Sequence, residues 1–327
     1  MSLYCDNCNH ENDDKETLCR KCGYSLLTEK KLKPGLILHE NYEIKRLIKS
    51  GGMGAVYEAL DKKSDTLCAV KEMLGQSCET LNNNQYMIDS FKREARILRS
   101  LHHSNIPVVR DYFIDDNRYY LVMDYIEGKD LDAVLHGYEG RGVPEELVIK
   151  WAIEILHALE YLHSQDPPVI YRDMKPENIM LQSSDEKVML IDFGLARTIN
   201  PLSQDTMTSV GTPAYAPKEL FQGQPQVRTD IYSLGATMHC LLTGVIPLIP
   251  FDFSPVRELN SNVSEKLEAI VMKALSMEPA DRYGRAKEMR EAIENLSGQS
   301  PQIMKEKQED DEKKSWYRNL ISFFFPG

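Results

Sequence analysis

The spacing of apolar positions divides the chain into three zones. Between Tyr42 and about Leu296, apolar residues recur with the periods of strands and helices, over enough residues to bury a substantial core. The first 27 residues contain few large apolar side chains. After Leu296 the segment SGQSPQIMKEKQEDDEKK loses all apolar periodicity, which is typical of a solvated, disordered linker.

The central zone changes from a strand pattern to a helix pattern. Apolar and polar residues alternate in five segments, residues 41–50, 55–62, 66–73, 108–114 and 118–126. One helix interrupts them, because a set of residues three or four apart shares one face: Met87, Phe91, Glu94, Ala95, Leu98 and Leu101. The later part is mostly helical and includes residues 146–164 and 229–245. We expect an α+β fold with a small β-rich lobe before a larger helical lobe.

These patterns also set the expected domain boundaries. TEKKLKPG, after the first zone, is charged and ends in Pro-Gly, as linkers do. The expected parts are a small module at 1–27, a linker at 28–41, a central domain at 42–297, a disordered linker at 298–314 and an apolar tail at 315–327. The β-rich lobe covers 42–126 and the helical lobe 127–297.

Composition and charge narrow the class of protein. Of the 327 residues, 42% are apolar and 27% are charged, as in ordinary soluble globular proteins. The formal net charge of -11 argues against nucleic acid as a partner, because phosphates attract a basic surface. The polar start predicts no secretory signal, and no apolar run reaches the about 18 residues of a membrane span. We expect a cytoplasmic protein.

Four of the seven cysteines form two C-x-x-C pairs in the first zone: Cys5 with Cys8, and Cys19 with Cys22. Four thiolates from two tight turns match tetrahedral Zn²⁺, which would fold a segment too short to bury a core. Chance pairs or a redox C-x-x-C are the alternatives. Because four cysteine ligands leave no open position for catalysis, we expect this zinc ribbon to bind a regulatory protein.

The other three cysteines lie in the central zone. Cys68 and Cys240 fall within apolar stretches and are expected to be small buried hydrophobes. Cys78 lies in the polar segment GQSCETLNNN and is expected to be exposed, with a redox role as an alternative.

The stretch LIKSGGMGAVYEAL, residues 47–60, contains a glycine cluster of the kind that lets a backbone approach phosphates. Gly51 and Gly54 fit the second and third positions of G-x-G-x-x-G, but Lys49 occupies the first. The cluster lies between two predicted strands, whereas a Rossmann or Walker loop would lead from a strand into a helix.

Other polar residues follow in a fixed order. Lys71 lies on the third predicted strand, and Glu94 lies on the apolar face of the next helix, where an unpaired carboxylate is costly. An ion pair between them explains both placements. Asp173 and Asn178 occur in YRDMKPEN, and Asp192 follows in IDFG. Each of these acids alone fits a surface or capping role. Together, the three residues supply an aspartate that can orient a hydroxyl group and oxygen ligands for Mg²⁺, as phosphoryl transfer requires.

With these motifs in this order, residues 42–296 resemble the catalytic domain of eukaryotic-like Ser/Thr protein kinases, which are widespread in bacteria. The resemblance implies a bilobal fold, ATP and Mg²⁺ as cofactors, and protein substrates. It implies catalytic roles for Asp173 and Lys175, with Lys71 on the phosphates and Glu94 bracing it. The implied nucleotide-binding residues are Gly51, Gly52, Met53, Gly54, Val56, Ala69, Lys71, Met123, Asp124, Ile126, Asn178 and Asp192, of which Asn178 and Asp192 hold Mg²⁺.

The resemblance also places an activation segment at residues 195–219. Arg172, before the catalytic aspartate, would bind a phosphate on Thr206, Thr208 or Ser209, and the alternative is that these are plain loop hydroxyls. Thr212 resembles the threonine that faces the substrate. Asp230 begins a segment that resembles the anchoring helix of the large lobe, and Arg282 resembles the arginine that pairs with Glu219.

Three departures from the family pattern affect the expected activity. Lys49 replaces a glycine, Tyr171 replaces the usual histidine at a packing position, and Pro217-Lys218-Glu219 replaces Ala-Pro-Glu. None removes a phosphate, metal or proton-transfer group, so we expect an active kinase that phosphorylates its own activation segment. The alternatives are a nucleotide-binding pseudokinase scaffold and a nucleic-acid adaptor built on the ribbon.

The apolar tail SWYRNLISFFFPG is too short to cross a membrane. Its aromatic residues follow Lys313 and Lys314, a composition that suits peripheral contact with a bilayer. Docking on the kinase core or on a partner is the alternative. The sequence carries no signal for the oligomeric state.

Overall fold

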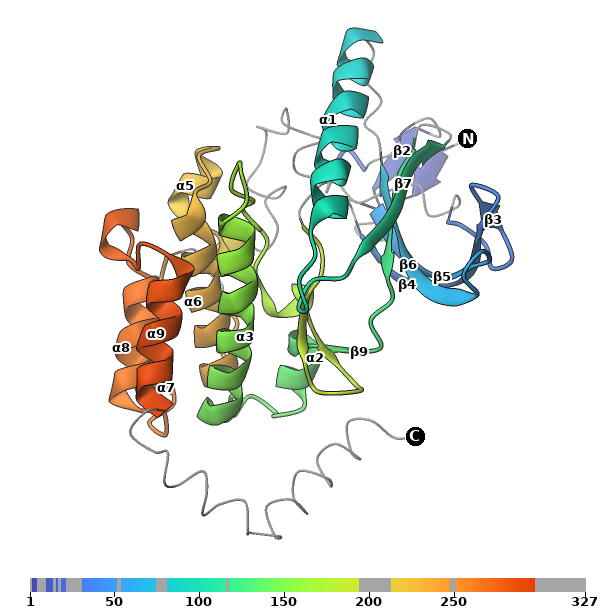
Figure 1. The fold of residues 1–327 in the computed structure, drawn as a ribbon. Coiled ribbons are helices and arrows are strands. Elements are labelled where there is room, and N and C mark those ends of the chain that lie inside the picture. The colour runs from blue at the N-terminus through green and yellow to red at the C-terminus, as the bar shows by residue number, and fades with distance from the viewer. Residues whose placement is uncertain are drawn as a thin grey trace. The chain divides into compact units, whose positions relative to one another are not determined.

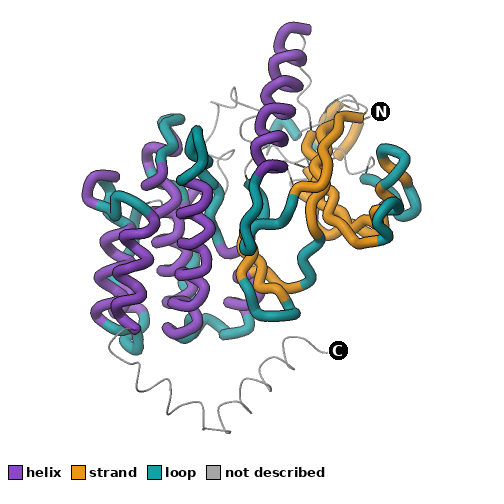
Figure 2. Tube along the Cα trace, viewed as in Figure 1, coloured by secondary structure: helices purple, strands orange, loops and turns teal. Residues whose placement is uncertain are grey.

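The computed structural model describes residues 2–4, 10–13, 16, 19–21, 31–51, 54–74, 81–115, 118–193, 213–247 and 251–297. They belong to two compact units. The N-terminal unit contains the described residues up to His102 and the segment Pro107–Ile126. The C-terminal unit contains His103–Ile106 and the described residues from Glu127 onward. Strands dominate the first unit and helices the second (Figure 2).

The N-terminal unit is built on a six-stranded antiparallel sheet with the order β3-β4-β5-β6-β8-β7 (Figure 1). Its strands are β3 (Ile37–Leu38), β4 (Tyr42–Gly51), β5 (Gly54–Asp61), β6 (Thr66–Leu74), β7 (Val109–Asp115) and β8 (Arg118–Asp124). The helix α1 (Leu81–Ser100) lies between β6 and β7 in sequence. Two further strands, β1 (Ser2–Tyr4) and β2 (Glu11–Asp13), pair with each other.

One face of the sheet carries a buried apolar cluster, and the burial along β5 alternates accordingly. Along β5, half-buried and buried residues follow one another without interruption. The buried face contains Tyr57, Val70, Tyr120 and Val122, and these pack in one apolar cluster. On α1, Phe91 is buried and its ring meets that of Tyr119 edge-on at 5.0 Å. The predicted strands are therefore confirmed, with ends shifted by one or two residues.

The C-terminal unit is mostly helical. Its helices are α2 (Leu131–His136), α3 (Glu145–His163), α5 (Lys218–Phe221), α6 (Val227–Thr243), α7 (Val256–Leu259), α8 (Glu265–Ala274) and α9 (Ala286–Ser297), with the 3₁₀ turns η2 (Pro176–Asn178), η3 (Pro213–Tyr215) and η4 (Pro279–Asp281). A three-stranded sheet of β9 (Gly128–Asp130), β10 (Ile179–Gln182) and β11 (Val188–Leu190) has the order β11-β10-β9.

The helix α6 is the centre of the C-terminal unit. It is buried on every side from Thr229 to Thr243, as expected of a helix surrounded by others. Reciprocal bonds between Gln226 and Thr229 cap its start, and Gly244 ends it with a φ of 74°. The predicted helices at 146–164 and 229–245 correspond to α3 and α6, which confirms the helical lobe.

Cys68 and Cys240, which the sequence predicts to be buried, are both buried in the structure. Burial raises the pKa of Cys68 and of Cys240 to about 11, so both thiols stay protonated at neutral pH. Cys78 lies outside the described residues. Within the described part of the chain, no helix is both long and apolar enough to cross a membrane.

Candidate active site

The register of β5, β6 and β8 gathers the predicted nucleotide-binding residues on one face of the sheet. Val56 is opposite Lys71, and Ala69 is opposite Met123. Residues opposite each other in antiparallel strands, and residues two apart along one strand, point to the same side. Val56, Ala69, Lys71 and Met123 therefore form one surface, opposite to the face that carries the apolar cluster.

The end of the glycine loop requires glycine. Gly54 has a φ of 142°, and a Cβ there would lie 1.9 Å from the carbonyl oxygen of Glu72 on β6. Lys49, by contrast, is exposed on β4 and does not have a positive φ. Lys49 is opposite Val56 in the register of β4 and β5, so it lies on the same face as the predicted nucleotide-binding residues. Gly51 ends β4, whereas Gly52 and Met53 lie outside the described residues.

Lys71 and Glu94 both belong to the N-terminal unit. Lys71 is half-buried in the middle of β6, between Val56 on β5 and Leu121 on β8. Glu94 is half-buried on α1, close along the helix to the buried Phe91 and Ala95. The ion pair between the two stays a prediction.

The last residue of β8, Asp124, is held by residues at and just before the start of β7. The Asp124 carboxylate accepts a hydrogen bond from the backbone N–H of Val108 at 3.1 Å and from Arg110 Nε at 2.9 Å. The backbone N–H of Asp124 donates to the Val108 carbonyl at 3.0 Å. Ile126, another predicted nucleotide-binding residue, is half-buried at the end of this unit.

In the C-terminal unit, Asp230 holds the backbone of the catalytic loop. Its carboxylate is fully buried at the start of α6 and accepts the backbone N–H groups of Tyr171 and Arg172, each at 2.9 Å. His163 Nε2 lies 2.8 Å from the same carboxylate. A buried carboxylate needs such partners, and satisfying them fixes the segment that leads to Asp173.

Asp173 and Asn178 meet within that loop. The Asn178 side-chain amide donates to Oδ2 of Asp173 at 2.8 Å and to the Asp173 carbonyl at 2.9 Å. These bonds orient the Asp173 carboxylate and leave the oxygen of the Asn178 amide as its remaining polar atom. Lys175 lies between these two residues in sequence, directly before the turn η2, and it is half-buried.

Asp192 follows the end of β11 and has a φ of 68°, and Arg172 has a φ of 69°. Non-glycine residues adopt this left-handed region at an energetic cost and are common at active sites. The amide oxygen of Asn178 and the carboxylate of Asp192 are hard oxygen donors from one unit, a set that fits Mg²⁺.

The predicted pair of Glu219 and Arg282 is present. Arg282 Nη1 lies 2.6 Å from Glu219 Oε1, and both side chains are buried. Thr229 adds a hydrogen bond to the same carboxylate oxygen at 3.1 Å. This ion pair ties α5 to the segment that precedes α9.

Several predicted residues lie outside the described part of the chain. They are Gly52, Met53, the zinc ligands Cys5, Cys8 and Cys22, the activation-segment residues Thr206, Thr208, Ser209 and Thr212, and the whole segment 298–327. Of the zinc ligands only Cys19 is described. Among the described residues, no group of three His, Cys, Asp or Glu side chains is arranged to hold a metal ion.

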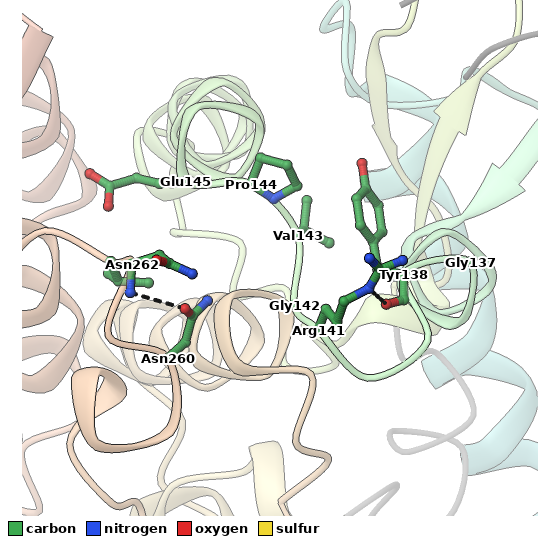
Figure 3. A pocket seen from close by; sticks show the side chains of 10 residues that line it. Gly137, Tyr138, Arg141, Gly142, Val143, Pro144, Glu145, Asn260 and Asn262 are labelled. Carbon is green, nitrogen blue, oxygen red and sulfur yellow. Dashed lines mark hydrogen bonds between the residues drawn. The ribbon is translucent and has the colours of Figure 1, made fainter. Parts of the chain in front are cut away.

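A pocket of about 450 Å³ in the C-terminal unit contains none of the predicted site residues (Figure 3). It is lined by the segment from Gly137 to Glu145 and by residues before α8. Two of its polar side chains are engaged: Glu145 accepts both the backbone N–H and the hydroxyl of Ser264 at 2.7 Å, and Asn260 accepts from the Asn262 N–H at 3.1 Å.

Sequence reasoning missed two sets of contacts. Glu72 is buried behind Lys71, where it accepts hydrogen bonds from Tyr57 and Tyr120 and pairs with Arg118. The Tyr171 hydroxyl bonds to backbone carbonyls near Asp192. The signal for the first was a carboxylate within a strand, and for the second a tyrosine at the position where a histidine was expected.

Comparisons with known proteins identify the same family that the site residues resemble. Residues 42–301 match the family model of the protein kinase domain. Serine/threonine-protein kinase B of Synechocystis sp. is 32% identical over 305 residues, which cover 88% of this chain and 50% of that protein. Serine/threonine-protein kinase PknA of Nostoc sp. is 34% identical over 278 residues, which cover 79% and 48%. The chain spans about half the length of these curated relatives.

Solved structures share the fold. The PknI kinase domain of Mycobacterium tuberculosis is 24% identical with a TM-score of 0.66, and the match covers 81% of this chain and 98% of that one. PpkA in its apo form is 27% identical with a TM-score of 0.69, and the match covers 80% and 99%. The chain belongs to the protein kinase family. Its catalytic domain is a Ser/Thr protein kinase domain of the eukaryotic-like type found in bacteria.

Proposed function

We propose that this chain transfers the γ-phosphoryl group of ATP to Ser or Thr hydroxyls of proteins. The bond from the γ-phosphorus to the β,γ-bridging oxygen breaks, ADP leaves, and the acceptor oxygen bonds to phosphorus. The acceptor proton passes to the Asp173 carboxylate. The observation that carries the proposal is the hydrogen bond of 2.8 Å that fixes Asp173 to Asn178 in a loop anchored on Asp230. Catalysis then comes from positioning and electrostatics.

The remaining roles are proposed from the resemblance to protein kinases, and the shared face of β5, β6 and β8 supports those of Val56, Ala69, Lys71 and Met123. Val56, Ala69 and Met123 contact adenine, Lys71 binds phosphates with Glu94 as its partner, and Asn178 and Asp192 hold Mg²⁺. Mg²⁺, when bound, neutralises charge that develops on the phosphates. Lys175 lies two residues after Asp173 and neutralises the γ-phosphate.

Two substitutions separate binding from chemistry. Lys71→Met should weaken ATP binding, because it removes a cation from the face shared with Val56. Asp173→Asn should leave ATP affinity within about threefold while abolishing transfer to a generic acceptor protein. Isothermal titration with an ATP analogue and γ-labelled ATP assays give the two readouts. A pseudokinase scaffold predicts binding without transfer in wild type as well.

The second part of the proposal is that the first 27 residues form a zinc ribbon that binds a regulatory protein. Three observations support it: the two C-x-x-C pairs, the antiparallel pairing of β1 with β2, and the surroundings of Cys19. Cys19 is 2% exposed, and its sulfur accepts the backbone N–H of Lys21 at 3.4 Å, a contact that stabilises a thiolate ligand. Metal analysis should find one zinc per chain, and Cys19→Ser should lower that content. A wild-type chain without zinc contradicts the proposal.

Regulation and location form the last part. Phosphate on Thr206, Thr208 or Ser209 is proposed to bind Arg172, and mass spectrometry of the autophosphorylated chain tests it. The protein is proposed to be cytoplasmic, and its tail at 315–327 to contact membranes peripherally. Liposome co-sedimentation of the full chain and of one ending at Lys314 tests the tail, since equal binding contradicts membrane contact.

A further inference from the structure

Part of the expected linker at 28–41 pairs with the sheet of the N-terminal unit. The Gly35 N–H donates to the Ile44 carbonyl at 2.8 Å, and the Ile44 N–H donates to the Leu36 carbonyl at 2.9 Å. The strand β3 then continues this pairing with β4. Because the same segment leads from the N-terminal module into the catalytic domain, its contacts determine how the two are connected.

A second attachment of the linker lies closer to the N-terminus, at Leu32. Its side chain packs against the apolar cluster of the sheet, and its backbone N–H donates to Tyr57 Oη at 3.2 Å. Tyr57 on β5 is fully buried and donates its own hydroxyl proton to Glu72 Oε2 at 3.0 Å. Burial raises the pKa of Tyr57 to about 12, so the hydroxyl keeps this proton at neutral pH. The linker is therefore bonded to a hydroxyl that is itself bonded to a buried carboxylate.

Glu72 connects three neighbouring strands on the face of the apolar cluster. It lies on β6 and is 3% exposed. Besides the bond from Tyr57 on β5, its carboxylate accepts a hydrogen bond from Tyr120 Oη at 3.3 Å and pairs with Arg118, both on β8. A buried carboxylate is costly unless donors satisfy its oxygens, so the partners of Glu72 hold β5, β6 and β8 together.

The opposite face of these three strands presents the proposed nucleotide-binding residues. Lys71 directly precedes Glu72 and is opposite Val56 on β5 and Leu121 on β8. Consecutive residues of a strand point to opposite sides and share one backbone, so a displacement of Glu72 also displaces Lys71. The contacts of Glu72 on one face therefore fix the position of Lys71 on the other.

We propose that the Tyr57–Glu72 pair is the docking site of the linker at Leu32, and that the docked linker strengthens ATP binding by fixing Lys71. The inference rests on the proposed function, which assigns the phosphates to Lys71. Binding free energies couple in both directions, so bound nucleotide also favours the docked linker by the same factor. A protein that binds the N-terminal module and prefers the released linker would lower ATP affinity through this contact.

The experiment measures both directions of the coupling in the full chain, without relying on phosphate transfer. Hydrogen–deuterium exchange at the Leu32 amide, measured by mass spectrometry, reports how often the linker is released. A saturating non-hydrolysable ATP analogue with Mg²⁺ should slow this exchange about fivefold or more. Tyr57→Phe lacks the acceptor, so its Leu32 amide should exchange rapidly with and without the analogue. This variant should also bind the analogue more weakly, by at least the factor measured for exchange.

A second variant separates the linker from the contacts of Glu72. Leu32→Ala keeps the backbone N–H and the Tyr57–Glu72 bond but loses the side chain that packs on the apolar cluster. It should therefore exchange faster at residue 32 and bind the analogue more weakly than wild type.

The matched control removes another tyrosine hydroxyl from the same apolar cluster. Tyr42 on β4 is 5% exposed, and its hydroxyl donates to Asp111 at 3.0 Å instead of to Glu72. Tyr42→Phe should leave Leu32 exchange and analogue affinity as in wild type. Thermal unfolding of each variant confirms that it is folded.

The outcomes separate the inference from the proposed function. The coupling is refuted if the analogue does not bind wild type, or binds it without slowing exchange at Leu32. It is also refuted if Leu32→Ala releases the linker but binds the analogue as wild type does, or if Tyr42→Phe weakens binding as much as Tyr57→Phe. Phosphate transfer by wild type together with any of these results leaves the proposed function standing. If wild type transfers no phosphate but the analogue slows Leu32 exchange, and both linker variants bind it more weakly, the proposed function fails and the coupling stands.

Discussion

The buried ion pair between Glu219 and Arg282 allows the most quantitative stability prediction. The guanidinium is fully buried and donates to both carboxylate oxygens, at 2.6 and 3.3 Å. It also donates to three backbone carbonyls, those of Ser276 at 2.8 Å, Met277 at 3.0 Å and Arg228 at 3.1 Å. One side chain therefore satisfies five acceptors from separate segments.

Arg282→Met would leave the Glu219 carboxylate buried without its cation. Removing one partner of a buried pair costs about 3–5 kcal/mol. Because three backbone carbonyls also lose their donor, we expect the cost of Arg282→Met to lie in the upper part of this range. For a domain of this size such a loss lowers the melting temperature by roughly 6–20 °C.

Urea and thermal unfolding of the full chain measure the effect. Arg141→Met is the control, because Arg141 and its partner Glu139 are 3.8 Å apart and their side chains are 77% and 82% exposed. Exposed pairs contribute about 0–1 kcal/mol. The double variant Glu219→Gln with Arg282→Met should be less destabilised than the sum of the single variants, because it leaves no unpaired charge. A loss below about 1 kcal/mol in Arg282→Met, equal to that of Arg141→Met, would refute the reasoning.

Three further predictions concern the loop and a buried histidine. Gly54→Ala should lower ATP affinity at least fivefold, measured by titration, because its Cβ would push on the Glu72 carbonyl next to Lys71; unchanged affinity would contradict this. Lys49→Gly should change ATP affinity less than tenfold, or ~1.4 kcal/mol, because Lys49 is exposed and does not have a positive φ; a larger gain would show that the missing glycine matters. Burial lowers the pKa of His239, so the unfolded chain binds more protons and stability falls as the pH drops below about 6.5. When the pH is lowered from 7.5 to 5.5, the free energy of unfolding should therefore fall by up to about 1 kcal/mol less in His239→Gln than in wild type. An equal fall in both proteins would show that His239 does not cause the pH dependence.

The fold was predictable where the spacing of apolar residues along a short segment indicates which side chains are buried. Alternation along residues 55–62 corresponds to the alternating burial of β5, and the apolar stretch at 229–245 corresponds to the buried helix α6. These features depend on neighbours a few residues apart, which a sequence displays directly.

The missed contacts join residues that are distant in sequence. Tyr171 bonds to Ile191, and Glu72 pairs with Arg118, across 20 and 46 residues. Tyr171 was expected only to pack, which its burial confirms, but no periodicity indicates that its hydroxyl reaches two carbonyls. Such bonds depend on the register of strands and the path of loops, which the sequence specifies only through the folded chain.

The most direct test of the account is phosphate transfer from γ-labelled ATP by the full-length chain, compared with its Asp173→Asn variant. With Mg²⁺ and a generic acceptor protein, wild type should place label on Ser or Thr, and Asp173→Asn should reduce the rate by at least about 10²-fold, the lower end of the contribution of a positioned acid–base group. No transfer by wild type, or equal transfer by both proteins, would contradict the assignment of the catalytic site.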